Sequence, residues 1–241
     1  MLYTRYSAAS DLTSNKRVLE LGCGAGQGFG LLSATAELLV GGDYSEALLS
    51  SAQRHYGARI PLVSLSADAL PFKPESFDVI LCFEASYYVA DMERAFDDIA
   101  RVLAPNGSVL FVNANPERAD FIESPHSVHY HSASEFRAAL SRRGFKVQVT
   151  GAFPTEPTSD KMRARITGGL FSIARRALQT FGLVPTTLRG RARLKRMVYR
   201  KLTKVPAELS PGFSEAAQLT PLGPGPQSGY KVLYVHGLRR E

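Results

Sequence analysis

Short apolar runs alternate with stretches of helical periodicity along the first 150 residues. Such a run is typical of a buried parallel strand, because helices cover both of its faces, whereas apolar residues at helical spacing indicate an amphipathic helix. The runs predict strands at 18–21, 38–42, 60–65, 77–83, 108–113 and 145–150, with a seventh at 231–236. The stretches between them predict helices at 27–35, 45–55, 92–103 and 132–144, and Ser132 and Glu135 have the spacing of a capping box at the start of the last one.

Strands that alternate with helices predict an α/β fold, a doubly wound, mostly parallel seven-stranded sheet with helices on both faces. Between the sixth and seventh strands lie 79 residues, far more than in a usual connection, so this segment must have structure or function of its own. We expect a core at 1–150, a basic, partly helical insertion at 151–229 and the last core strand within 230–241. Residues 1–14 are too short for a cap domain, and we expect a frayed terminus.

The first apolar run ends in alternating glycines, Glu20-Leu21-Gly22-Cys23-Gly24-Ala25-Gly26. Glycines directly after a strand let the backbone turn sharply and approach a ligand closely. Asp43 closes the second run 21 residues after Gly22, and an acid at about that spacing is placed to accept hydrogen bonds from both hydroxyls of a ribose. A dinucleotide-binding loop needs a glycine at position 27, where this chain has Gln27, so a nicotinamide-dependent oxidoreductase is disfavoured.

The spelling Glu20-x-Gly22-x-Gly24-x-Gly26 resembles the first motif of the class I S-adenosylmethionine-dependent methyltransferases. Ser66 to Phe72, followed by Ser76 to Ile80, is similar to the next two landmarks of that family, in the same order. The resemblance covers about residues 15–150 and the last dozen, and implies S-adenosyl-L-methionine as cofactor. It implies cofactor contacts by Glu20, Gly22, Cys23, Gly24, Gly26, Asp43, Tyr44, Ala67, Asp68, Ala69, Phe83 and Glu84.

Several of these residues have more than one interpretation. In the family the acid at Asp68 receives the adenine amino group and the small residue at Ala69 lies against the ring, but Asp68 could instead cap the turn before Pro71. Tyr3 and Tyr6 could fold back over the cofactor, as N-terminal aromatics do in some relatives. Glu84 could position the acceptor or the methionine amino group, or hydrogen-bond its own loop.

The methyl acceptor is expected outside the carboxyl ends of the fourth and fifth strands. Tyr87 and Tyr88 could wall the sulfonium by cation–π contact or serve as packing residues, and Asn113 is a further candidate substrate contact. Proton removal from a hydroxyl needs a base, and a neutral imidazole suits that task near pH 7. His126, His129 and His131 are the candidates, although a polar loop can collect histidines without using them, and no acid or cysteine accompanies them at metal-ligand spacing.

The choice of acceptor class rests on resemblance. The Asn/Asp-Pro-Pro-aromatic motif of nucleobase amino-methyltransferases is replaced by Phe83-Glu84-Ala85-Ser86, so a nucleic-acid substrate is not expected. The spelling Asp68-Ala69-Leu70-Pro71-Phe72 is similar to the branch that acts on small molecules, sugars, quinones and lipids. We expect O-methylation of a small or lipid-linked hydroxylated acceptor such as a sugar. The alternative is a non-catalytic cofactor-binding module that docks to a membrane surface or nucleic acid.

Charge is concentrated in one segment. The net charge is +7, yet 13 of the 29 Lys and Arg residues and none of the 22 acids lie in 161–204. The apolar stripe of Ile166 to Val184 predicts a helix there, which could be a lid over the acceptor, an interfacial helix on an anionic membrane, or a grip on a substrate phosphate. With two isolated cysteines and no signal peptide or spanning segment, we expect a cytoplasmic protein, soluble or peripheral at the inner membrane face.

Overall fold

The computed structural model describes residues 1–155 and 206–240. The predicted helix at 166–184 and the basic cluster that follows it lie outside the described residues. Of the proposed insertion 151–229, the first residues continue a core strand and the last two dozen pack against the core.

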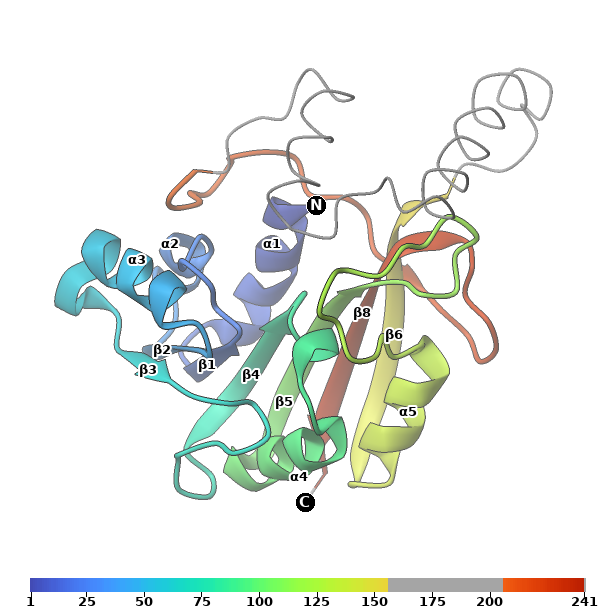
Figure 1. The fold of residues 1–241 in the computed structure, drawn as a ribbon, viewed down its shortest axis with the longest axis horizontal. Helices are drawn as coiled ribbons and strands as arrows, with labels where there is room; N and C mark the ends of the chain where they lie inside the picture. The colour runs from blue at the N-terminus through green and yellow to red at the C-terminus, as the bar shows by residue number, and fades with distance from the viewer. Residues whose placement is uncertain (156–205, 241) are drawn as a thin grey trace.

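A single sheet organises the chain, with strand order β3-β2-β1-β4-β5-β8-β6-β7 (Figure 1). The first five strands pair in parallel, and β8 is antiparallel to both β5 and β6, so β6 again runs parallel to β5. The sheet thus has eight strands where seven were expected, because the two-residue β7 adds an antiparallel edge beside β6. The strands are β1 (Arg17–Leu21), β2 (Leu38–Asp43), β3 (Leu62–Ser64), β4 (Phe77–Phe83), β5 (Leu103–Ala114), β6 (Phe145–Pro154), β7 (Thr220–Pro221) and β8 (Tyr230–Arg239).

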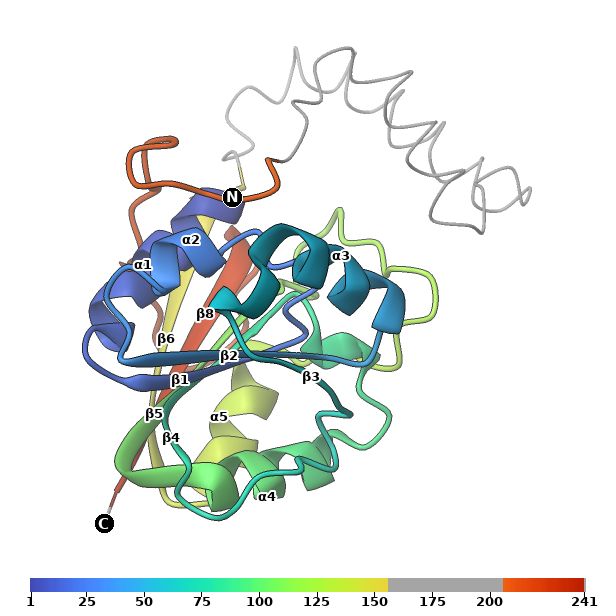
Figure 2. The same ribbon diagram turned by 90° about the vertical axis from the view of Figure 1, so that its left-hand side faces the viewer.

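Helices cover both faces of the sheet, as the doubly wound pattern predicts (Figure 2). On one face lie α1 (Leu2–Thr13), α2 (Phe29–Leu32) and α3 (Glu46–Tyr56), and on the other α4 (Met92–Val102) and α5 (Ala133–Ser141). Short 3₁₀ turns follow α3 at Gly57–Arg59 (η1) and β4 at Ser86–Tyr88 (η2). Two clusters of buried apolar side chains, one on each face, fill the space between the helices and the sheet.

Local capping signals set several helix ends. Ser45 accepts a hydrogen bond from the Leu48 amide at the start of α3. Ser132 and Glu135 form a complete capping box at the start of α5, which confirms the sequence prediction. The helix expected at 27–35 is shorter, since only Phe29–Leu32 is α-helical.

The N-terminus is not frayed, which corrects the sequence prediction. Residues 2–13 form α1, which buries Tyr6 and Ala9 in the core. Two buried positions of this helix are the polar Thr4 and Thr13, so its apolar stripe is too weak to read from the sequence. The start of α1 lies at the edge of the sheet where the parallel strands end (Figure 1).

Candidate functional site

The glycine turn after β1 has the backbone that its sequence predicts. Gly22, Gly24 and Gly26 adopt φ of +70°, +59° and +77°, a region that strains other residues. A Cβ on Gly22 would lie 2.3 Å from that of Ala85, so the turn also packs closely against the loop after β4. A Cβ on Gly24, in contrast, would approach only the Gln27 side chain, at 3.9 Å, which leaves one side of the turn open for a ligand.

Asp43 at the end of β2 is tied to both neighbouring segments. Its Oδ2 accepts a hydrogen bond from the Gly24 amide at 2.7 Å, and its Oδ1 accepts one from the Ser45 amide at 2.8 Å. A carboxylate has about four acceptor positions, so two remain for the hydroxyls of a ribose. The adjacent Tyr44 is 84% exposed, which leaves its ring free to cover a bound base.

The loop after β3 places Asp68 and Ala69 along the same edge of the sheet. The Ser66 hydroxyl donates to Asp68 Oδ1, and the Ala69 amide donates to the Ser66 carbonyl. The Leu70 amide before Pro71 donates to Asp98 Oδ2, so among the described residues no bond from Asp68 caps this turn, and Asp68 keeps its second oxygen for a ligand. An open cavity of about 490 Å³ lies here, lined by Asp68, Ala69, Leu70, Arg94, Asp97 and Asp98.

Glu20 is buried on the α1 side of β1. Its Oε1 accepts a 2.7 Å hydrogen bond from the Tyr6 hydroxyl, while its Oε2 has no hydrogen-bond partner among the described residues. Burial raises the pKa of this carboxyl to about 8, against the opposing effects of the Tyr6 hydrogen bond and the Arg5 charge. Cys23, whose pKa burial also raises, and Cys82 are buried free thiols.

Glu84 follows β4 and links α1 to the acceptor side of the site. Its φ is +53°, and its amide donates to the Val112 carbonyl at 2.7 Å. Oε1 lies 3.3 Å from Arg5 Nη2, and Oε2 accepts a 3.1 Å hydrogen bond from the Tyr87 hydroxyl. The preceding Phe83 is buried and meets the Tyr6 ring edge to face at 5.2 Å.

Tyr87 forms an aromatic cluster that the sequence analysis did not identify. Its ring stacks on Tyr130 with centroids 4.1 Å apart, and Phe121 packs edge-on against Tyr130 at 4.7 Å. Burial, followed by the Glu84 charge, raises the pKa of Tyr87, so the phenol is a hydrogen-bond donor near neutral pH. Tyr88 beside it is 43% exposed, which makes it the most accessible of the three predicted substrate contacts Tyr87, Tyr88 and Asn113.

Asn113 and Asn115 at the end of β5 have different surroundings. Asn113 is buried, its Oδ1 accepts from the Ser86 hydroxyl at 3.1 Å, and its Nδ2 has no hydrogen-bond partner among the described residues. Asn115 donates to the carbonyls of Gln227 and Tyr230, so it fastens the chain before β8 to the end of β5. Asn113 therefore keeps free hydrogen-bonding capacity, and Asn115 is structural.

The three histidines of the loop before α5 have different surroundings. His126 is exposed on a turn with φ of +67°. His129 Nε2 lies 2.9 Å from Glu135 Oε1, beside the capping box. His131 packs against Phe96 and Phe136, and burial lowers its pKa. The His129 and His131 rings meet edge to face with centroids 4.6 Å apart. Among the described residues no group of three or more His, Cys, Asp or Glu is arranged to hold a metal ion.

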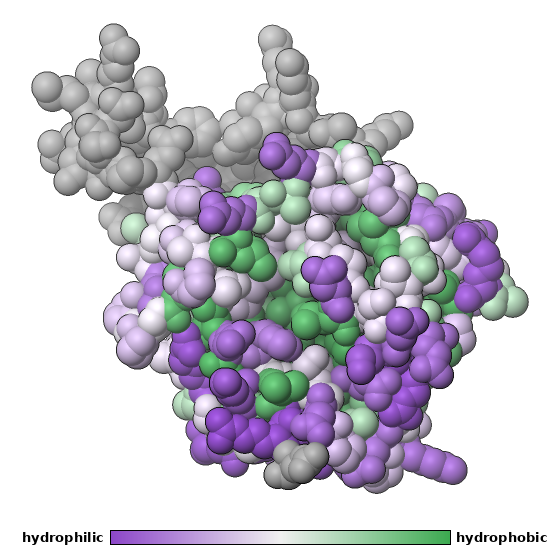
Figure 3. Space-filling model, turned by 180° about the vertical axis from the view of Figure 1, so that it is seen from behind, coloured by the Kyte–Doolittle hydropathy of each residue, from purple (hydrophilic) through white to green (hydrophobic). Residues whose placement is uncertain are grey.

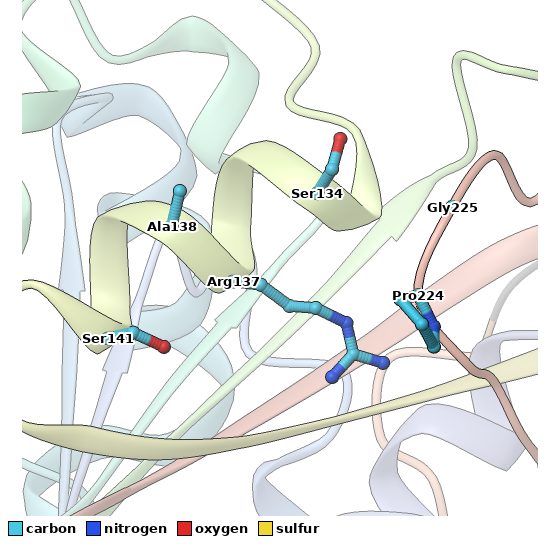
Figure 4. A pocket seen from close by; sticks show the side chains of 6 residues that line it. All are labelled: Ser134, Arg137, Ala138, Ser141, Pro224 and Gly225. Atoms are coloured by element: carbon cyan, nitrogen blue, oxygen red, sulfur yellow. The ribbon is translucent and has the colours of Figure 1, made fainter.

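A second cavity, of about 350 Å³, lies between α5 and the turn that follows β7 (Figure 4). Arg137 extends from α5 toward this turn and donates to the carbonyls of Val147 and Leu222. None of the predicted site residues lines it, and the guanidinium serves to hold β6 and the chain after β7 together. The lining residues are Ser134, Arg137, Ala138, Ser141, Pro224 and Gly225.

Comparison with known proteins points to one family. Residues 19–111 match a family model described as a methyltransferase domain. The chain is 35% identical over 133 residues to phthiotriol/phenolphthiotriol dimycocerosates methyltransferase 1 of Mycobacterium ulcerans, covering 52% of this chain and 49% of that protein. It is also 35% identical over 118 residues to a fatty-acid O-methyltransferase of Mycolicibacterium smegmatis, covering 48% and 43%. The chain thus spans about half the length of the curated relatives it matches.

The fold has close counterparts among solved structures. The crystal structure of the YcgJ protein of Bacillus subtilis superposes with a TM-score of 0.64 at 20% identity, covering 99% of both chains. At that identity the likeness concerns the fold alone. It agrees with the doubly wound, mostly parallel sheet.

Proposed function

We propose that this chain, which belongs to the class I S-adenosylmethionine-dependent methyltransferases, binds S-adenosyl-L-methionine and methylates a hydroxyl of a small or lipid-linked acceptor. The observation that carries this proposal is the joint placement of the glycine turn, Asp43 and Asp68 at consecutive strand ends of one sheet edge. The open side of Gly24 and the unpartnered Glu20 Oε2 fit a ligand with a polar amino-acid tail.

Each of these residues then has a distinct task. Asp43 accepts hydrogen bonds from the ribose hydroxyls, Asp68 from the adenine amino group, and Ala69 and Tyr44 lie against the base. The turn of Gly22 to Gly26 lies along the amino-acid half, with Glu20 beneath it. Bound S-adenosylmethionine supplies a methyl group activated by a sulfonium, which leaves the protein to orient the acceptor and accept its proton.

On the acceptor side, the cluster of Tyr87, Tyr130 and Phe121 offers an apolar aromatic wall, and Asn113 and Glu84 offer polar atoms. This combination suits an acceptor with an apolar body and a hydroxyl. The names of two relatives, one acting on a dimycocerosate lipid and one on fatty acids, support a lipid-linked acceptor. His126, His129 and His131 remain the proposed bases, with His126 and His129 more accessible than the half-buried His131.

We further propose peripheral contact with an anionic membrane through residues 161–204. The 13 basic residues without an acid support this, because each basic residue near an anionic surface contributes about 1 kcal/mol. The described residues that flank 156–205 lie at the sheet edge that carries the site, because β6 ends there at Pro154 and the Leu209 amide bonds to Gln27. Several apolar patches lie among polar side chains on the face opposite that of Figure 1 (Figure 3). The described residues include no helix long and apolar enough to cross a bilayer.

Two measurements test the reaction. Calorimetric titration with S-adenosylhomocysteine should show binding by the wild-type protein, with nicotinamide dinucleotide as the negative control. Tritium from methyl-labelled S-adenosylmethionine should then appear in the organic phase of a lipid extract incubated with the enzyme. Binding without transfer to lipid or water-soluble extract would favour the alternative of a non-catalytic cofactor-binding module.

Flotation with vesicles tests the membrane contact. The protein should float with vesicles that contain phosphatidylserine and stay behind with neutral phosphatidylcholine vesicles. The triple substitution Arg189→Glu, Arg191→Glu and Arg193→Glu should abolish the difference. Equal flotation with both vesicle types, or with neither, would contradict an electrostatic membrane contact.

A further inference from the structure

Residues 206–219, which we name the strap, return from the segment 156–205 and lie across α1 and the glycine turn (Figure 1, orange). Leu209 is fully buried, and its amide donates a 2.7 Å hydrogen bond to the carbonyl of Gln27, the residue that directly follows the turn of Gly22 to Gly26. Further along, the Gly212 amide donates to the Tyr3 hydroxyl at 2.9 Å, and the Ala217 amide donates to Thr4 Oγ1 at 3.2 Å. The strap is therefore fastened to the turn and to the first helix.

Glu208 fastens the strap to α3 as well. Its Oε2 lies 2.8 Å from His55 Nε2 and 3.9 Å from Arg59 Nη2, and its side chain is about two-thirds buried. Gly30 in α2 makes room for this contact, since a Cβ there would lie 2.4 Å from Glu208 Oε1 and 2.7 Å from the Leu209 carbonyl oxygen. The strap thus fits α2 by shape and α3 by charge.

Three segments from different parts of the chain hold the glycine turn. From α1, the Tyr6 ring fills the space above Gly28, where a Cβ would lie 1.8 Å from a ring carbon. From α3, the Tyr56 hydroxyl donates a 2.6 Å hydrogen bond to the Gly26 carbonyl. The strap supplies the third contact, at Gln27, between the other two. A ligand that lies along this turn meets a backbone whose position depends on all three.

We propose that Glu208 and Leu209 are positioning residues for the cofactor, which act by holding Gln27 and α3 in the arrangement that binds the nucleoside. This inference rests on the proposed function. If docking of the strap favours cofactor binding, cofactor binding must favour docking of the strap by the same factor, because the coupling between two binding equilibria is reciprocal. The strap would then connect the basic segment before it to the occupancy of the cofactor site.

Calorimetric titration of the full chain with S-adenosylhomocysteine measures the first half of this coupling. Glu208→Gln keeps the size of the side chain and removes the ion pair, and should raise Kd about threefold, as expected for a partly exposed pair. Gly30→Ala blocks the strap by shape and should raise Kd about tenfold, although alanine favours the α2 helix itself. Glu215→Gln, which removes the same charge from an exposed position of the strap, is the matched control and should bind like the wild type.

Hydrogen exchange of peptides from 206–213 measures the reverse effect, that of cofactor binding on docking of the strap. A strap with a merely structural role would show no such effect. S-adenosylhomocysteine should slow exchange of these peptides in the wild type and in Glu215→Gln, while in Gly30→Ala they should exchange fast with or without the ligand. Binding with no change of strap exchange, or equal affinity in all variants, overturns the positioning role and leaves the proposed function intact. Absence of binding by the wild type overturns both.

Discussion

The two halves of the candidate site are built in different ways. In the cofactor half, at the ends of β1, β2 and β3, the groups proposed to face the ligand are set by backbone conformation and by short-range contacts, such as Asp43 with Ser45 or Ser66 with Asp68, while distant segments such as the strap hold the turn from outside this motif. In the acceptor half, at the ends of β4 and β5, they join residues far apart, such as Glu84 with Arg5 or Tyr87 with Tyr130. The cofactor does not vary with the acceptor, so a local motif can bind it. The acceptor half is assembled from distant segments, so its residues can be substituted without altering the cofactor motif.

The sharpest test of how the cofactor half is built compares its Gly22 with Gly144, a glycine outside the site that directly precedes β6. Gly22→Ala places a methyl group 2.3 Å from Ala85 Cβ on a residue with φ of +70°, and should destabilise the protein by at least about 3 kcal/mol. Gly144→Ala, at φ of +81° with nothing within 4 Å, adds backbone strain alone and should cost about 1 kcal/mol. Urea unfolding at pH 7 measures the loss of stability in both variants. Equal losses would show that the close packing of Gly22 against Ala85 adds nothing to the backbone strain.

The next largest effect concerns binding. Asp43→Asn should weaken S-adenosylhomocysteine binding about 100-fold, since hydrogen bonds to a charged group contribute roughly 1.5–3 kcal/mol each. Asp78→Asn makes the same change at the start of β4, away from the strand ends that carry the site. The Asp78 carboxylate pairs there with Arg17 at 2.8 Å, and the substitution should leave S-adenosylhomocysteine affinity within about twofold. Calorimetry checks both, and a similar loss in the two variants would show that Asp43 acts through stability alone.

Two glutamates should give opposite pH dependences. The pKa of Glu20 is raised to about 8 by burial, so the folded state binds more protons than the unfolded chain between pH 4.5 and 8. Its contribution to stability is complete below pH 4.5 and is lost as pH rises, by up to about 1.4 kcal/mol per pH unit. Glu20→Gln should flatten urea-unfolding stability between pH 5 and 8.

In the acceptor half, Glu135 has the reverse behaviour. Hydrogen bonds from Ser132 and from His129 lower its pKa to about 2, although burial opposes them. Its contribution is complete above pH 4.5 and is lost as pH falls toward 2. The loss of stability in Glu135→Gln should be small, because about half of the Glu135 side chain is exposed and water screens its interaction with His129. The stability difference between wild type and variant should change with pH in opposite directions for Glu20→Gln and Glu135→Gln. A change in the same direction would contradict these assignments.

The smallest effect should come from Tyr87→Phe. This substitution removes the hydrogen bond to Glu84 and keeps the stack on Tyr130, so S-adenosylhomocysteine affinity should stay within about twofold. Transfer of labelled methyl to a lipid extract should fall about fivefold, as expected for one lost hydrogen bond of about 1 kcal/mol. A larger loss of cofactor affinity than of transfer would place Tyr87 in the cofactor half.

The same contrast explains what the sequence could predict. The glycine turn and the capping box of Ser132 and Glu135 were predicted because a few neighbouring residues determine each of them. Tyr130, Arg5 and the strap were missed, since their positions depend on contacts across many residues of chain that leave no local pattern. The polar stripe of α1 concealed the N-terminal helix, and the two-residue β7 was too short for any periodicity.

The position of β8 has a consequence for synthesis on the ribosome. This strand is made after every other strand, yet it is inserted between β5 and β6 and pairs with both along most of its length. Until it leaves the exit tunnel, two long strands present unpaired edges, which are prone to aggregation and are a typical target of chaperones. A nascent chain arrested shortly before residue 230 should therefore remain incompletely folded, even though the glycine turn and its strands have already been translated.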